Sequence, residues 1–96
     1  MDSWSTYAWI LLAIRPTATT KDDVHWRAEA LNKVPATDAE IDAAVDWLRR
    51  AGLVVATADG FAWTEAGQKV VEEEWTATSM YDTWDRVAKR LRTLLR

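Results

Sequence analysis

Between positions 38 and 50, apolar residues recur at the i, i+3, i+4 and i+7 spacing that is typical of a helix with one buried face. They are Ile41, Ala44, Val45 and Leu48. Thr37 precedes this stretch and is a favourable N-cap, acidic residues fill its first turns, and Arg49 and Arg50 fill its last turn, where the helix dipole favours cations. The pattern predicts an amphipathic helix with one outward face.

A β-hairpin is predicted immediately after this helix. Gly52 suits the left-handed residue that ends a helix. Residues 53–57 have β character, Asp59-Gly60 is a favoured two-residue hairpin turn, and residues 61–63 return beside the first strand. The hairpin is the most specific local signal in the chain.

The rest of the chain predicts further helices from its capping residues and apolar spacing. One continues to about residue 14, one runs from about 21 to 32, one from about 65 to 75, and one covers the C-terminal end. The expected caps are Ser3, Ser5 or Thr6 for the first of these, Thr64 for the third, and Ser79 and Asp82 for the last. The apolar stripe of the last helix is Met80, Trp84, Val87, Leu91, Leu94 and Leu95. Together the elements predict a mainly α-helical fold with a small β-hairpin, in a single domain over residues 1–96.

The first predicted helix is apolar on both of its faces. One face carries Tyr7, Ile10, Leu11 and Ile14, and the opposite face carries Trp9, Leu12 and Ala13. A helix that is apolar all round is expected to be covered on two sides. Two interpretations remain open, a core helix between the rest of the domain and the C-terminal helix, or the seam of a dimer. The apolar stripe of the C-terminal helix needs a partner surface, which the first helix offers within the chain or from a second copy.

Composition and charge restrict the class of protein. The chain has 96 residues, seven tryptophans, no cysteine, a net charge of −3 and a pI near 5.0. Such a charge gives no overall attraction to nucleic acid or to an anionic membrane, and without cysteine the fold must rest on packing. The apolar stretch at 7–14 is far shorter than the roughly 20 residues that span a bilayer, and Asp2 lies where a signal peptide carries a cation. We therefore expect a soluble, cytoplasmic protein.

No catalytic, metal or cofactor motif stands out. His25 and Glu29 have the i, i+4 spacing of a metal-binding pair, but a lone histidine beside a glutamate is more often a solvated surface pair. The acidic run at 72–74 is typical of a solvated face. There is no phosphate-binding glycine loop and no nucleophile elbow. The sequence predicts a protein that is not an enzyme and holds no cofactor.

Two segments together resemble a known family. LNKVPATDAEIDAAVDWLRRAGLV, followed by TEAG, looks like a group of short bacterial winged-helix proteins whose activity is uncharacterised. The order of helices, hairpin and trailing amphipathic helix is similar to winged helix-turn-helix regulators of the MarR and PadR type. The resemblance implies a three-helix core, a two-stranded wing and a trailing C-terminal helix. Turn, cap and core positions carry it, so it is more specific for a fold than for an activity.

The resemblance also implies where DNA would be contacted. The exposed face of the third helix would enter the major groove, and the wing would reach phosphate. The residues at the groove positions here are Ala39, Ala43, Asp46, Arg49 and Arg50. Two alanines cannot read bases by hydrogen bonds, Asp46 would face phosphates, and the tip of the wing brings another acid and no base. Both contact elements therefore depart from the DNA-binding pattern.

The leading hypothesis from sequence is a small non-catalytic module that acts through protein contacts, including self-association as a homodimer or binding to another protein. The candidate interaction residues lie away from the main stripes or at the C-terminal end, and they are Trp9, Leu12, Trp47 and Leu95. The alternative is a dimeric DNA-binding transcriptional regulator of winged-helix type. No membrane association is expected.

Overall fold

The computed structural model describes residues 2–14, 19–32 and 36–94, which form helices and one antiparallel hairpin. The elements in chain order are α1 (Ser3–Ala13), α2 (Lys21–Asn32), α3 (Asp38–Arg50), β1 (Val54–Ala56), β2 (Phe61–Trp63), α4 (Glu65–Glu74) and α5 (Met80–Thr93). The prediction of a mainly helical fold with a small hairpin is confirmed. None of these helices has the length and apolarity to cross a bilayer.

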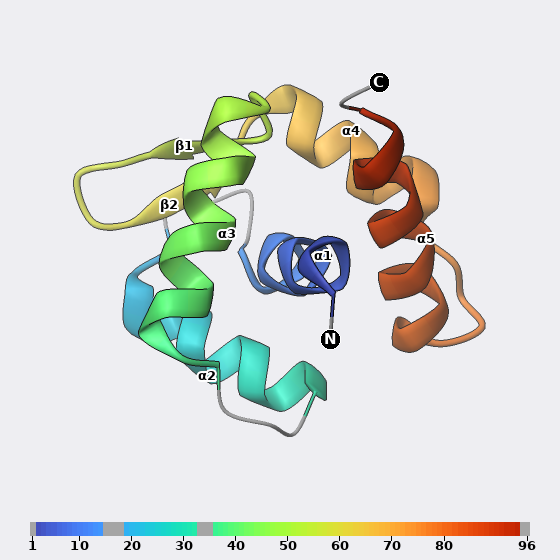
Figure 1. Ribbon diagram of the computed structural model, residues 1–96, viewed down its shortest axis with the longest axis horizontal. Coiled ribbons are helices and arrows are strands. Elements are labelled where there is room, and N and C mark those ends of the chain that lie inside the picture. The colour runs from blue at the N-terminus through green and yellow to red at the C-terminus, as the bar shows by residue number, and fades with distance from the viewer. Residues whose placement is uncertain (1, 15–18, 33–35, 95–96) are drawn as a thin grey trace.

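α1 lies in the centre of the molecule, and the other helices are arranged around it (Figure 1). Every residue of α1 after Ser3 is buried or half-buried. Its most extensive packing is against α5, followed by α3 and α2. The interpretation of α1 as a core helix is therefore confirmed. The apolar face of α5 is covered within the chain at Val87 and Leu91, whereas Leu94 at its end is 42% exposed.

Tryptophan indoles connect distant elements to backbone carbonyl oxygens. Nε1 of Trp63 in β2 donates to the carbonyl of Leu11 (2.8 Å), and Nε1 of Trp84 in α5 donates to the carbonyl of Ser5 (2.7 Å). Nε1 of Trp9 donates to the carbonyl of Ala28 in α2 (2.8 Å). The ring of Trp9 is buried and those of Trp63 and Trp84 are half-buried, and each polar N–H is satisfied. These bonds account for part of the high tryptophan content.

The helix caps follow the sequence with one correction. Thr37 and Glu40 form a reciprocal capping box at the start of α3, and Thr64 and Ser79 cap α4 and α5. The prediction for α1 was wrong, because Asp2 is the N-cap and its carboxylate accepts from Ser5 N at 2.8 Å. An aspartate caps as well as serine or threonine, and its charge also complements the helix dipole.

The hairpin has the predicted strands but a different turn. Val54 pairs with Trp63, and Ala56 pairs with Phe61. Beyond the strands, the amide of Thr57 donates to the carbonyl of Gly60 (2.8 Å), so the turn residues lie between these two, at 58 and 59. The predicted Asp59-Gly60 turn was wrong by one position. Among the glycines of the chain, positive φ is confined to Gly52 (77°), which ends α3 as expected.

Gly60 is required for a steric reason. Thr19, in the segment between α1 and α2, pairs with Phe61 through two backbone hydrogen bonds of 2.7 and 2.8 Å. A Cβ atom at position 60 would lie 1.8 Å from the carbonyl oxygen of Thr19. Glycine therefore permits the close approach that fixes the hairpin to the helical core.

Candidate interaction surface on α3

α3 exposes the face that the family resemblance assigns to DNA contact. Its inner face is buried through Ile41, Ala44 and Leu48, which are fully inaccessible to solvent. The residues predicted as DNA contacts all lie on the exposed side, and they are Ala39, Ala43, Asp46, Arg49 and Arg50. The helix pattern therefore predicted correctly which side of α3 is available for binding.

The first half of this face is acidic, and its carboxylates bind the cations of the neighbouring helix. Lys21 Nζ lies 2.8 Å from Asp42 Oδ1 and 3.8 Å from Asp38 Oδ1. His25 Nε2 donates to Asp38 Oδ1 at 2.7 Å. The hydrogen bond from His25, with the charge of Lys21, holds the pKa of Asp38 below its usual value, and the hydrogen bond to Asp42 raises the pKa of Lys21. His25 thus pairs with Asp38 on α3 rather than with Glu29.

The second half of the face carries both arginines. Arg50 forms an i, i+4 ion pair with Asp46, and its hydrogen bond to that carboxylate raises the pKa of Arg50. Arg49 is exposed and forms no ion pair with any residue that the structure describes. Among the described basic residues of α3, Arg49 alone is therefore not engaged by a carboxylate.

A groove of about 500 Å³ separates the end of α3 from β1. It is lined by Asp46, Arg49, Arg50, Val54, Val55 and Ala56. One wall is charged, and the other is the apolar edge of the hairpin, where Val55 is 48% exposed. The groove brings two arginines next to the hairpin, but it brings Asp46 with them.

The predicted interaction residues outside this face are distributed differently. Trp9 is only 1% exposed, so its assignment to a surface was wrong, because a central helix has no outward side. Leu12 and Trp47 are half-buried against the core. The ring of Trp47 stacks on Tyr7 with centroids 5.0 Å apart and meets the edge of Trp4. Leu95 lies outside the residues that the structure describes.

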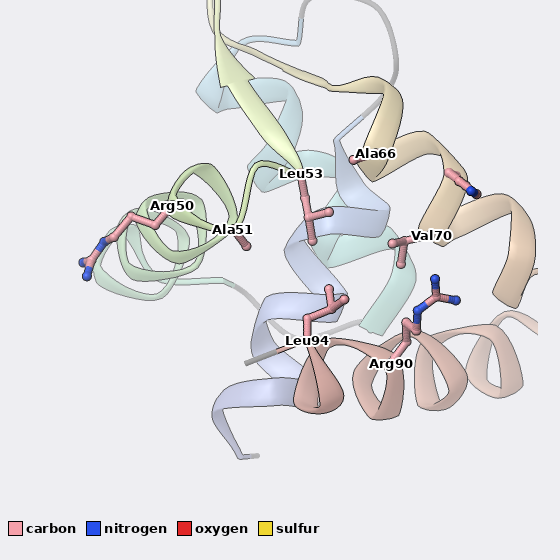
Figure 2. A pocket seen from close by; sticks show the side chains of 8 residues that line it. Arg50, Ala51, Leu53, Ala66, Val70, Arg90 and Leu94 are labelled. Carbon is pink, nitrogen blue, oxygen red and sulfur yellow. The ribbon is translucent and has the colours of Figure 1, made fainter. Parts of the chain in front are cut away.

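A second cavity, of about 470 Å³, lies between the end of α3 and the helices α4 and α5 (Figure 2). The apolar side chains of Leu53, Val70 and Leu94 point toward one another in it, whereas Arg50 and Arg90 lie on opposite sides of it. Arg90 is held by Glu73 (3.0 Å) and Glu74 (2.9 Å), and these bonds raise the pKa of Arg90. The two arginines do not converge on one point.

Several exposed aromatic residues had no clear sequence signal. Trp26 is 71% exposed on α2, Tyr81 is 58% exposed on α5, and Trp75 is 54% exposed directly after α4. Trp26 lies off the apolar stripe of its helix, which was a partial indication. The exposure of Trp75 and Tyr81 could not be predicted from the sequence, since both adjoin predicted helix ends that also carry buried residues.

Comparisons of the chain with models of protein families, with curated proteins and with solved structures found no match.

Proposed function

We propose that the chain is a winged helix-turn-helix module without catalytic activity and that it binds a protein partner through the outward face of α3. The order of the elements supports the winged-helix assignment, with α3 at the position of a recognition helix and the hairpin as the wing. The pairing of Thr19 with Phe61 supports it further, because it joins the segment between α1 and α2 to the wing.

The engagement of nearby cations by the carboxylates of α3 is the observation that carries this proposal. Lys21 and His25 are bound by Asp38 and Asp42, and Arg50 is bound by Asp46. A duplex that approached this face would meet acidic groups and would have to displace those ion pairs before it gained phosphate contacts. Affinity for DNA depends mainly on phosphate neutralisation, for which this face offers Arg49 as its one arginine without an ion pair among the described residues.

The same face suits a protein with a basic surface. Ala39 and Ala43 lie exposed between the acidic residues, and a small side chain loses little conformational entropy when a partner covers it. The surrounding carboxylates would steer a cationic partner and fix its orientation. Self-association through α1, the other form of the hypothesis, loses its support because the two apolar faces of α1 are covered within the chain.

A DNA-binding regulator remains the second candidate, and one observation favours it. Arg49 and Arg50 lie beside the wing, in the groove between α3 and β1, where a phosphate could be held. An experiment must therefore distinguish a protein partner from a nucleic-acid partner.

A photo-reactive phenylalanine derivative at position 43 tests the proposal in the cells that make this protein. The matched control carries the same residue at position 77, which is an exposed alanine between α4 and α5. We expect position 43 to form a crosslink to a discrete protein and position 77 to form none. Crosslinks from position 43 to DNA would contradict the proposal, as would an identical set of products from both positions.

A further inference from the structure

A small aromatic cleft lies where β2 passes into α4, on elements other than the outward face of α3. It has a volume of about 330 Å³ and is lined by Trp63, Val71, Glu72 and Trp75. Two indoles and an isopropyl group make its surface almost wholly apolar, and the side chain of Glu72 completes the lining. This combination of groups is the starting point of the inference.

One wall of the cleft is held in place by the fold. Trp63 is half-buried, and its Nε1 donates to the carbonyl of Leu11 in the central helix at 2.8 Å. Val71 is 4% exposed and belongs to the core. A ligand would therefore meet a preformed wall, which lowers the entropic cost of binding.

The other wall is an exposed indole. Trp75 follows the last residue of α4, is 54% exposed, and is one of the residues that line the cleft. Solvation of so large an apolar ring is unfavourable, and a ligand between Trp63 and Trp75 would remove part of that surface from water.

The carboxylate at the cleft keeps its charge uncompensated. Glu72 accepts a hydrogen bond from the neutral amide of Gln68 at 2.8 Å and forms no ion pair with any described residue. Its neighbours differ, since Glu73 binds Arg90, and Glu74 binds Arg86 and Arg90. Glu72 therefore carries a negative charge that no described cation pairs with, and it lines the same cleft as two indoles.

We infer that this cleft binds an organic cation of the alkylated ammonium class. Indole faces attract cations through the ring quadrupole, and tryptophan does so most strongly. Methyl groups on the nitrogen satisfy the apolar walls, while the positive charge is attracted by Glu72. The volume lies near the lower limit for small-molecule sites, which fits a trimethylammonium head, carried either by a free small molecule or by an alkylated lysine of a protein.

Choline and its uncharged isostere, in which a tert-butyl group replaces trimethylammonium, test the inference directly. The two probes have the same shape and differ in charge, and binding is followed through the indole N–H signals of Trp63 and Trp75 by NMR. We expect choline to produce saturable shifts of these two signals and to bind about fivefold more tightly than the isostere. Equal affinity for the two probes, or the absence of a saturable choline shift, would overturn the assignment.

Single substitutions test separately how the charge of Glu72 and the indole of Trp75 contribute to choline binding. Glu72→Gln should weaken choline binding but leave it tighter than binding of the neutral probe, because the indoles still attract the cation, whereas Glu65→Gln, an exposed glutamate of the same helix outside the cleft, should leave it unchanged. Trp75→Ala should abolish binding, and Tyr81→Ala should not. An unaltered choline affinity in Glu72→Gln would contradict the role of the carboxylate.

A peptide with one trimethyllysine distinguishes the two sources of the cation. Tighter binding of the peptide than of choline would assign the cleft to a modified protein, and equal or weaker binding would assign it to a free small molecule. The cleft shares no residue with the outward face of α3, so failure of this inference leaves the proposed function of α3 untouched.

Discussion

At the scale of single residues, the carboxylates of α3 pair with basic side chains of the same chain. Asp38 accepts a hydrogen bond from His25 and lies near Lys21, and both side chains come from α2. This arrangement joins two consecutive helices and pairs the charge of Lys21 with carboxylates of α3. A single aspartate thus links α3 to α2.

The first prediction concerns the titration of Asp38. Its folded pKa lies below the ordinary value of 3.8, mainly because of the hydrogen bond from His25. A depressed folded pKa means that the stabilising contribution is fully present above pH 3.8 and is lost as the pH falls below that value through the folded pKa. An NMR titration of the Asp38 carboxyl carbon measures this directly. His25→Ala should move the pKa upward toward 3.8, and an unchanged titration curve would disprove the pairing.

The second prediction compares two glycines that the fold needs for different reasons, a close approach of the backbone at Gly60 and a left-handed conformation at Gly52. Gly60→Ala places a Cβ atom 1.8 Å from the carbonyl oxygen of Thr19, so the pairing of Thr19 with Phe61 must break. Hydrogen exchange should show loss of protection at the amides of Thr19 and Phe61. Gly52→Ala meets no atom within 4 Å and should cost only the roughly 1–2 kcal/mol of a left-handed alanine, with that protection retained. Retained protection in Gly60→Ala would contradict the steric account.

At the scale of elements, most local features were predicted from the sequence, with the N-cap of α1 as an exception, and long-range contacts were not. The cap at Thr37, the cap at Thr64 and the exit at Gly52 depend on residues within one turn of one another, and each was predicted. The hairpin turn was predicted one position too late because glycine at position 60 is required by the close approach of Thr19, which is 41 positions earlier in the chain. No local pattern contains that contact.

For the candidate surface, too, local features were predictable from the sequence and long-range contacts were not. Exposure of Ala39, Ala43 and Arg49 follows from helical periodicity alone. The pairing of Lys21 and His25 with carboxylates of α3 depends on how α2 packs beside α3, which a linear sequence does not state. Burial of Trp9 was missed for a related reason, since periodicity assumes that a helix has an outer side.

The third prediction tests the capping box of α3. Thr37→Ala removes the hydroxyl that accepts from Glu40 N (3.1 Å) and should lower the free energy of unfolding by about 1 kcal/mol. Thr37→Ser keeps the acceptor oxygen and should remain near the stability of the original protein. Urea denaturation of the three proteins provides the comparison. Equal losses in both variants would indicate that packing of the threonine methyl group, rather than the cap, stabilises the helix.

At the scale of the whole molecule, the central position of α1 determines which surfaces are free. α5 and α3 cover the two sides of α1 that the sequence left open for a second copy (Figure 1). The exposed surfaces therefore belong mainly to the outer elements, and α3 presents the acidic face described above. The net charge of −3 agrees with this local distribution.

We propose that the outward face of α3 does not serve as a DNA-binding surface. A titration of the protein with DNA at low salt tests this directly. The fluorescence anisotropy of a labelled random-sequence duplex is measured against protein concentration at increasing salt. Non-specific DNA-binding proteins hold such a duplex with a Kd of roughly 10⁻⁴–10⁻⁶ M at physiological salt and more tightly below it. We predict no saturable binding in this range. Binding whose affinity falls steeply with salt, and which Arg49→Glu abolishes but Arg92→Glu on α5 does not, would contradict the account.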